Sequence, residues 1–334
     1  MINVALVGYG YWGVNLLRNL TSIEECNVLA VCESNQSRHA LLTGLYPGIS
    51  IVSNYEDILN NEAIEAVVIA TPVGTHYELT KKALLKGKHV LVEKPLTDSV
   101  KTAQELVELA QSKNLLLMVD HTFLYSGAVE KIEELVSSGA IGTLQYLDST
   151  RINLGLIQSD INVLWDLAPH DLSILMAIMK EPPTGVSANG ISHIETGIEN
   201  IAYMTLHYSS QFIAHFNCSW SSPVKVRTML IGGNKKMIMY DDINPTEKIK
   251  VYDSGYMCKT DEDRRKIQVD YRVGDIHVPK ISRHEPLRKM LEDFLYCIET
   301  KTTPKSSCEL GLQVVKVLEA AQASIKNDSK KILI

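Results

Sequence analysis

The first third of the chain alternates short apolar runs with amphipathic segments. Each apolar run is bounded by polar or turn residues, which predicts a short buried strand, and the amphipathic segments between the runs predict helices. The predicted strands are residues 2–7, 28–32, 49–52, 66–70, 89–92 and 115–119. Strands that alternate with helices in this way form a doubly wound parallel sheet with right-handed crossovers.

The pattern changes after about residue 121. Segments 128–137 and 169–179 are predicted helices, and strands of an antiparallel sheet are predicted at 144–153, 201–208, 212–219, 226–231, 236–240, 249–252 and 269–273. Helices at 286–300 and 307–326 follow. Large side chains on both faces of the strand at 201–208 suggest that one face packs on helices and that the other is a subunit interface.

A glycine loop stands between the first strand and the first helix, with the sequence Gly8-Tyr9-Gly10-Tyr11-Trp12-Gly13. In a strand–turn–helix context G-x-G-x-x-G indicates dinucleotide binding. The first glycine permits the turn, the second lets the backbone approach a pyrophosphate, and the third lets helix and strand pack closely. The alternative is a glycine turn without a ligand. We expect a Rossmann domain at residues 1–121 and an α+β domain at 122–334, with the closing helices packing back towards the first domain.

The second strand ends in an acid, Glu33, where a carboxylate could bind the adenosine ribose. A carboxylate there repels the 2′-phosphate of NADP, so Glu33 favours NAD. Arg38 is near enough in the sequence to leave NADP open.

Composition narrows the class of protein. The 334 residues carry a formal net charge of −6 without a long basic run, which argues against a nucleic-acid or membrane-surface partner. Six scattered cysteines without a C-x-x-C pair suit reduced thiols and offer no zinc site. No apolar run approaches the length of a membrane span, and the N-terminus enters a strand directly. We expect a cytoplasmic protein without a metal.

Polar residues follow two of the predicted parallel strands. Thr71, Pro72 and His76 follow the fourth, and Glu93 and Lys94 follow the fifth. Open α/β sheets bind ligands at this edge. We therefore assign these residues, together with the glycine loop (Tyr11 and Trp12 included), Glu33 and Arg38, to the cofactor site. The alternative for Glu93 and Lys94 is a solvated ion pair.

A second cluster is Trp165-Asp166-Leu167-Ala168-Pro169-His170-Asp171. On a helix Asp166 and His170 share one face. Pro169 is compatible with a first helical turn, which would place His170 at a helix N-terminus, where the dipole favours a neutral ring. Asp171 has the opposite effect. The alternative is a capping or core histidine.

At these residues the chain resembles the Gfo/Idh/MocA family (glucose–fructose oxidoreductase, inositol dehydrogenase and rhizopine catabolism) over nearly its whole length. The motifs that carry the resemblance are the glycine loop, Ala70-Thr71-Pro72 with His76, Gly87-Lys88-His89-Val90-Leu91-Val92-Glu93-Lys94-Pro95, Gly139-Ala140-Ile141-Gly142 and Asp166 to Asp171.

The resemblance implies an NAD(P)-dependent oxidoreductase with a Rossmann domain and a second domain whose open sheet pairs subunits into a homodimer or homotetramer. It implies that Lys94 lies beside nicotinamide and substrate and stabilises the developing alkoxide. His170 is then the proton acceptor and Asp166 the carboxylate that assists it, while hydride moves to nicotinamide C4.

The chain departs from many relatives at Thr122-Phe123-Leu124-Tyr125, where they carry an arginine. His121 to Tyr125, Ser149 to Asn153 and Val163 to Asp166 resemble a branch associated with nucleotide sugars and surface polysaccharides. That resemblance implies a sugar substrate and makes Tyr125, Arg151, Asn153 and Trp165 candidate substrate contacts, with packing as the alternative for Trp165.

The sequence thus predicts an NAD-dependent dehydrogenase or ketoreductase that acts on a ring hydroxyl or ketone of a nucleotide-linked sugar. The alternatives are a cyclitol dehydrogenase that uses the same three residues, and a non-catalytic dinucleotide sensor. A sensor would be expected to lose Lys94 or His170, and this chain has both.

Overall fold

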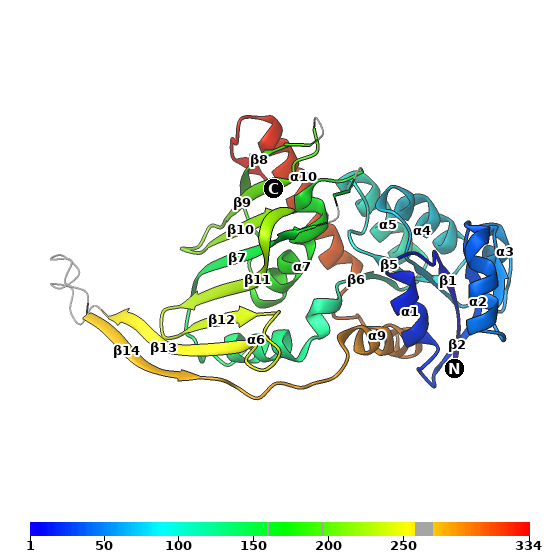
Figure 1. Ribbon diagram of the computed structural model, residues 1–334, viewed down its shortest axis with the longest axis horizontal. Helices are drawn as coiled ribbons and strands as arrows, with labels where there is room; N and C mark the ends of the chain where they lie inside the picture. The colour runs from blue at the N-terminus through cyan, green and yellow to red at the C-terminus, as the bar shows by residue number, and fades with distance from the viewer. Residues whose placement is uncertain (156, 159, 195–196, 258–269) are drawn as a thin grey trace. The chain divides into compact units, whose positions relative to one another are not determined.

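A computed structural model describes residues 1–155, 157–158, 160–194, 197–257 and 270–334 (Figure 1). The chain forms two compact units. The first comprises residues 1–125 and 284–316, and the second comprises residues 126–283 and 317–334. Helix α10 (Cys308–Lys326) begins in the first unit and ends in the second.

The first unit contains the predicted parallel sheet. Its strands are β1 (Ile2–Val7), β2 (Cys26–Cys32), β3 (Ser50–Val52), β4 (Ala66–Ile69), β5 (His89–Glu93) and β6 (Leu117–Asp120). They pair in parallel in the order β3-β2-β1-β4-β5-β6. Every residue of β4 and β6 is buried. The prediction of a doubly wound Rossmann sheet is confirmed, and its topological switch point lies between β1 and β4.

Helices cover both faces of this sheet. They are α1 (Gly13–Leu20), η1 (Gln36–Arg38), α2 (His39–Leu45), α3 (Tyr55–Leu59), η2 (Val73–Thr75), α4 (His76–Leu85), α5 (Val100–Ser112), η3 (Thr122–Tyr125) and α9 (Pro286–Thr300). In Figure 1 α4 and α5 lie on one side of the sheet and α1 and α9 on the other. Glu285, which precedes α9, accepts hydrogen bonds from Arg18 (2.6 Å) and Asn19 (3.0 Å) of α1. These bonds join two helices that are far apart in the sequence.

Helix ends follow the expected signals. Ser99 is the N-cap of α5 and accepts a hydrogen bond from the Thr102 N–H. Gly87 follows α4 with φ +76°, in the left-handed region that ends many helices.

The second unit contains, within the described residues, a nine-stranded sheet of order β14-β13-β12-β11-β7-β10-β9-β8-β15. The strands are β7 (Leu144–Leu154), β8 (Gly185–Ile191), β9 (Ile201–His207), β10 (Ile213–Ser219), β11 (Ser221–Gly233), β12 (Met237–Asp241), β13 (Ile249–Met257), β14 (Asp270–His277) and β15 (Ile332–Leu333). β10 pairs with β7 in parallel, and the other pairs are antiparallel. The predicted mostly antiparallel sheet is confirmed. β8 and β15 were not predicted, and Val269 of the predicted strand 269–273 lies outside the described residues.

One face of this sheet is buried and the other is partly exposed. Ala202, Met204 and Leu206 of β9 are buried, whereas Tyr203 of the same strand is 45% exposed. Helices α6 (Gly127–Ser137) and α7 (Val163–Ile178) belong to this unit, and α7 packs on β7, β9 and β10. The expectation that helices cover one face is therefore met, and a subunit interface on the other face stays a prediction.

Helix α7 corrects the sequence interpretation. It begins at Val163 with Asn162 as its N-cap, six residues before the predicted start at residue 169. Pro169 therefore lies inside the helix and not in its first turn. Proline removes one helical hydrogen bond, but this helix is buried along most of its length, and burial outweighs that loss.

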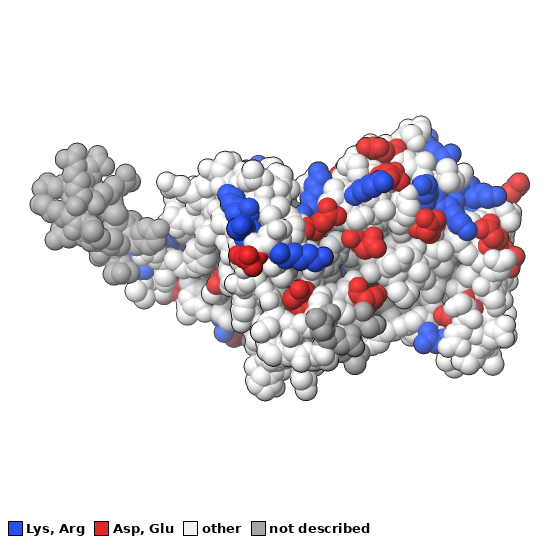
Figure 2. Space-filling model, turned by 90° about the horizontal axis from the view of Figure 1, so that it is seen from above, with Lys and Arg blue, Asp and Glu red and all other residues white. Residues whose placement is uncertain are grey.

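Charged side chains are mixed on the surface. On the face shown in Figure 2, Lys and Arg side chains are interspersed with Asp and Glu. In the described part of the chain, no helix is both long and apolar enough to span a membrane.

Candidate active site

The glycine loop has the geometry that dinucleotide binding requires. Gly8 has φ +94°, and a Cβ added to it would lie 2.6 Å from the Ala70 carbonyl oxygen. A Cβ on Gly13 would lie 2.2 Å from the Gly8 carbonyl oxygen. A Cβ on Gly10 would meet nothing within 4 Å. Two of the glycines therefore permit close packing, and the third leaves open space beside the backbone where a pyrophosphate can approach. The loop fits a dinucleotide.

Glu33 is bound to the glycine loop. Its side chain is buried, and its two carboxylate oxygens accept hydrogen bonds from the Tyr9 N–H (2.8 Å) and the Asn35 N–H (2.7 Å). The Arg38 guanidinium donates a hydrogen bond to the Tyr9 carbonyl oxygen (2.5 Å). Its Nη1 atom lies 3.7 Å from Oε2 of Glu33. A carboxylate has about four acceptor positions, so acceptor capacity is left for ribose hydroxyls. The sequence did not indicate that Glu33 also holds the loop.

At the end of β4, the predicted cofactor contacts separate into accessible and buried residues. Pro72 is exposed and Thr71 is half-buried. His76 is 1% exposed, with Nδ1 2.9 Å from the Pro95 carbonyl oxygen and Nε2 2.8 Å from the Thr71 carbonyl oxygen. The ring therefore connects the end of β4 to the turn after β5. This arrangement supports a positioning role for His76.

Lys94 follows β5 and is half-buried, and its backbone N–H donates to the Glu93 carboxylate. Burial lowers the pKa of His76 and of His121, and the positive charge of Lys94 lowers both further. The same charge opposes the burial that raises the pKa of Asp120. The positive charge of Lys94 therefore affects ionisable groups at the start of α4 and at the end of β6.

Asp120, the last residue of β6, was not predicted as a site residue. Its carboxylate is 3% exposed and accepts hydrogen bonds from the Trp12 indole (2.7 Å) and from the Thr122 N–H (3.2 Å) and hydroxyl. Trp12, a predicted cofactor contact, thereby joins the glycine loop to the far strand of the sheet. Nothing in the sequence pairs these two residues, because they are 108 positions apart.

In the second unit, α7 carries Asp166 and His170. Asp166 lies in the first helical turn and His170 lies one turn later. The predicted placement of His170 at the helix N-terminus is therefore wrong. The positive end of the helix dipole lies next to Asp166 and not next to His170. Among residues 163–171, only Asp166, Leu167 and His170 are not buried. The two predicted catalytic residues therefore lie on the one accessible stripe of this part of the helix.

Trp220 holds the Asp166 carboxylate. Its indole N–H donates to Asp166 Oδ2 (3.0 Å), and the Trp220 side chain is 1% exposed. A buried indole needs a partner for its single donor, and here the partner is the accessible acid. The sequence analysis missed Trp220 because the contact spans 54 residues.

Three of the four predicted substrate contacts are buried. Tyr125 is 2% exposed, and its hydroxyl is bonded to Asp293 (2.6 Å) and to the Ser306 N–H (3.2 Å). The Trp165 side chain is 8% exposed, which agrees with packing. Asn153 is half-buried. Of the four predicted substrate contacts, Asn153 is the one whose exposure supports contact with a substrate.

Arg151 forms a buried ion pair with Asp171. Its Nε and Nη2 atoms lie 3.0 and 2.5 Å from the two Asp171 oxygens, and the Ser149 hydroxyl donates to the same carboxylate (2.7 Å). Burial alone would lower the pKa of Arg151, but the charge of Asp171 raises it. This pair attaches α7 to β7 one residue beyond His170 and offers Arg151 little access to a substrate.

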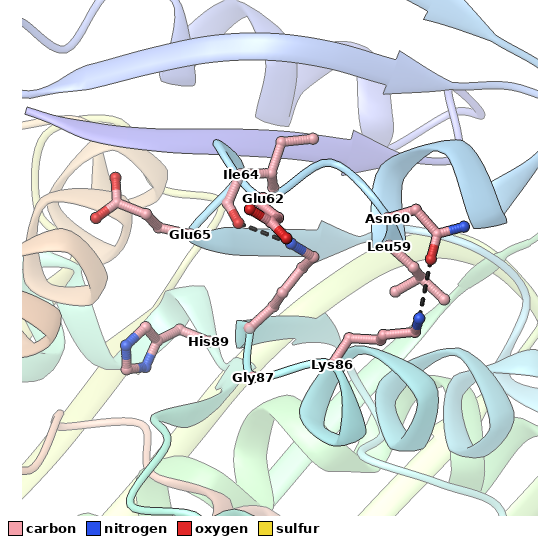
Figure 3. A pocket seen from close by; sticks show the side chains of 9 residues that line it. Leu59, Asn60, Glu62, Ile64, Glu65, Lys86, Gly87 and His89 are labelled. Atoms are coloured by element: carbon pink, nitrogen blue, oxygen red, sulfur yellow. Dashed lines mark hydrogen bonds between the residues drawn. The ribbon is translucent and has the colours of Figure 1, made fainter.

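A cavity of about 470 Å³ lies at the other edge of the parallel sheet, at the amino ends of β4 and β5 (Figure 3). There the buried Lys88 ammonium donates to the carbonyl oxygens of Asn61 and Ile64, both at 2.8 Å. None of the predicted site residues lines this cavity. In the described ranges, no group of His, Cys, Asp or Glu side chains is arranged to hold a metal ion.

The fold and the glycine loop define a dinucleotide-binding protein. Residues 2–121 match the oxidoreductase family with an NAD-binding Rossmann fold, and residues 129–239 match the GFO/IDH/MocA C-terminal domain. The chain belongs to the Gfo/Idh/MocA family of oxidoreductases.

Relatives match over the full length. The uncharacterized oxidoreductase YdgJ of Escherichia coli is 34% identical over 98% of this chain and 97% of its own. The scyllo-inositol 2-dehydrogenase (NADP(+)) IolW of Bacillus subtilis is 27% identical over 97% and 94%. The solved structure of UDP-N-acetylglucosamine 3-dehydrogenase GnnA from Acidithiobacillus ferrooxidans has a TM-score of 0.83 at 20% identity and covers 98% of this chain and 99% of its own. The predicted enzyme class and family are confirmed.

The glycine loop gives a matched pair of variants. Gly13→Ala forces a methyl group against the Gly8 carbonyl, so we expect a loss of about 1–3 kcal/mol in the free energy of unfolding. Gly10→Ala has open space, so its stability should stay within about 0.5 kcal/mol of wild type, while NADH binding weakens. Urea unfolding and NADH titration measure both effects. Equal destabilisation by the two variants would contradict the assignment.

Arg151→Met tests whether Arg151 is structural. It leaves the Asp171 carboxylate buried without its cation, so we expect a loss of about 3–5 kcal/mol in the free energy of unfolding. Arg227, 3.5 Å from Asp242 and about one-third exposed, is the control, and Arg227→Met should cost at most about 1 kcal/mol. Unchanged stability of Arg151→Met combined with a raised KM would instead make Arg151 a substrate contact.

Proposed function

We propose that this chain is an NAD-dependent dehydrogenase or ketoreductase that acts on a ring hydroxyl or ketone of a nucleotide-linked sugar. The observation that carries the proposal is the accessible stripe of α7, where Asp166 and His170 stand one turn apart and Trp220 holds the acid. The other carboxylate of this segment, Asp171, is paired with Arg151. Asp166 and His170 are therefore the residues of α7 that we assign to proton transfer.

Each residue has a defined part in the proposed reaction. A bound nicotinamide dinucleotide supplies hydride chemistry. His170 takes the proton from the reacting hydroxyl in oxidation and returns it to the ketone in reduction. Asp166, fixed by Trp220, stabilises the imidazolium that forms. Lys94 stabilises the negative charge that develops on the substrate oxygen, because an alcohol loses hydride readily only as it loses its proton.

The proposed cofactor is NAD. Glu33 is buried and ionisable at the end of β2, and a second negative charge on a 2′-phosphate there would be repelled. Arg38 lies 3.7 Å from the Glu33 carboxylate and offsets part of this repulsion, so NADP is the alternative cofactor. The relative IolW is named for NADP(+), so the cofactor has to be measured directly.

Two substrate classes are considered. A nucleotide-linked sugar is proposed from the resemblance of His121 to Tyr125, Ser149 to Asn153 and Val163 to Asp166 to the nucleotide-sugar branch. A cyclitol is the second candidate, favoured by the similarity to IolW over nearly the whole chain. Both classes present a ring hydroxyl to the same three residues, Lys94, Asp166 and His170.

We also propose that the partly exposed face of the second sheet forms a homodimer or homotetramer interface. Tyr203 (45% exposed), Ile213 (49%) and Leu230 (42%) lie on that face, and the Tyr203 ring stacks on His215. Exposed apolar groups across several strands favour contact with another surface.

A substrate panel tests the function. Nucleotide sugars, free sugars and inositols are each mixed with the purified protein and NAD, and reduced nicotinamide is followed by its absorbance. We expect turnover of a nucleotide sugar, with Lys94→Ala lower by about 10²–10³ and His170→Ala by about 10²–10⁴. Both variants should still bind NADH, because neither change removes the glycine loop, and His170→Ala should bind it with wild-type affinity.

The outcomes separate the candidates. Turnover of inositols alone would favour the cyclitol dehydrogenase. Wild-type rates in Lys94→Ala would remove Lys94 from the mechanism. A lack of turnover in both directions, with keto-sugars and NADH included, would favour the non-catalytic sensor.

Glu33 variants test the cofactor assignment. Glu33→Gln removes the negative charge and keeps one acceptor oxygen for the loop, so we expect the preference for NADH over NADPH to fall by about tenfold. Glu33→Ala should reduce the preference similarly and also lower stability, because the N–H groups of Tyr9 and Asn35 lose their acceptors. Kd values for both cofactors and thermal unfolding measure this. A wild-type preference for NADPH would overturn the assignment.

A further inference from the structure

His121, the residue after β6, is buried without hydrogen bonds to its ring. Its side chain is 1% exposed, and neither Nδ1 nor Nε2 has a hydrogen-bond partner among the residues that the structure describes. Its backbone is ordered by hydrogen bonds to the Val119 carbonyl (2.8 Å) and from the Leu124 N–H (3.0 Å). The ring therefore brings two polar atoms into the interior with nothing to bind them.

Such an arrangement is unfavourable unless a partner arrives. A buried polar atom without a partner keeps the full cost of leaving water, and an apolar ring of similar shape would avoid that cost. Within the described part of the first unit, the one other buried side chain with such an atom is Thr80 of α4, through its hydroxyl. An unpartnered buried group needs an explanation, and a ligand that is absent from the protein alone is one.

The place of His121 in the sheet indicates which ligand. In a sheet of this order, each half binds one nucleotide of the dinucleotide. Glu33 follows β2 in the half that binds adenosine, and His121 follows β6 in the other half. Its near neighbours include Lys94, the proposed catalytic lysine, whose charge acts on the His121 ring.

The protonation state of His121 indicates what it can bind. Burial and, to a smaller extent, Lys94 lower the pKa of His121 to about 3, so the ring is neutral near pH 7. Asp120, beside it in the chain, is already bound by Trp12 and Thr122. A neutral imidazole has one N–H donor and one acceptor nitrogen. A primary carboxamide offers the complementary acceptor and donor.

We propose that His121 binds the nicotinamide half of the cofactor and that the carboxamide of nicotinamide supplies the partner its ring lacks. His121 is thus a cofactor-binding residue in addition to those that the sequence indicated. The inference rests on the proposed dinucleotide site. It assigns His121 a role in binding and no part in the proton transfer of His170.

His121→Phe tests this by separating stability from binding. The variant removes both unpartnered nitrogens, so its melting temperature without ligand should equal or exceed that of wild type. Its Kd for NADH should rise by about tenfold, which corresponds to the loss of a hydrogen bond. Its Kd for ADP-ribose, which lacks nicotinamide, should stay within about twofold. Isothermal titration with the two ligands and thermal unfolding give all three quantities.

Thr80→Val is the matched control. It removes an unpartnered buried hydroxyl from the same unit at constant shape, so it should keep or raise stability and leave both Kd values unchanged. His121→Gln retains a donor and an acceptor and should recover part of the NADH affinity. A measurement on the wild type does not depend on any variant: the ¹⁵N shifts of the His121 ring should move on adding NADH and not on adding ADP-ribose.

Several results would overturn the inference. Wild-type NADH affinity in His121→Phe would do so, as would equal weakening of NADH and ADP-ribose, which indicates a general structural role. If His121→Phe does not fold, ring shifts that do not respond to NADH would decide against it. Failure of the wild type to bind either ligand would instead remove the proposed function itself.

Discussion

The first unit depends on the contact between the start of α1 and the end of β1. The Gly13 Cα lies so close to the Gly8 carbonyl that a methyl group would come within 2.2 Å of it. This contact places the glycine loop, and two buried carboxylates then hold the loop from both sides. Glu33 of the segment after β2 binds the Tyr9 N–H, and Asp120 of β6 binds the Trp12 indole. The loop is thus held by hydrogen bonds to residues at the ends of two strands that lie outside it in the sequence.

In the second unit, polar contacts hold α7 on the sheet. The Asn162 side chain accepts hydrogen bonds from the N–H groups of Leu164 and Trp165, and its amide donates to Glu199 (2.7 Å). Arg151 of β7 binds Asp171. Because these contacts lie at two points along the helix, they set its rotation as well as its position. Because the orientation of α7 about its own axis is fixed, Asp166 and His170 lie on its accessible stripe.

The sequence predicted the architecture because apolar periodicity records burial. The six parallel strands and the long antiparallel sheet followed from it, and so did the N-cap at Ser99 and the turn at Gly87. The candidate site was predicted less completely, because its supporting contacts join residues far apart in the chain. Trp220 with Asp166, Trp12 with Asp120 and Arg151 with Asp171 leave no local pattern. Helix α7 was predicted too short because proline usually marks a boundary, and tertiary burial overrode that preference.

The partners of the carboxylates separate structural acids from the proposed chemical one. Glu33 and Asp120 are buried and accept hydrogen bonds from N–H groups of the glycine loop, and Asp171 is neutralised by Arg151. Asp166 alone of these four is half-exposed, and it accepts a hydrogen bond from the neutral indole of Trp220. A nearby carboxylate favours the charged form of an imidazole. Its accessibility therefore distinguishes Asp166 from the buried acids that the sequence places equally near a predicted site.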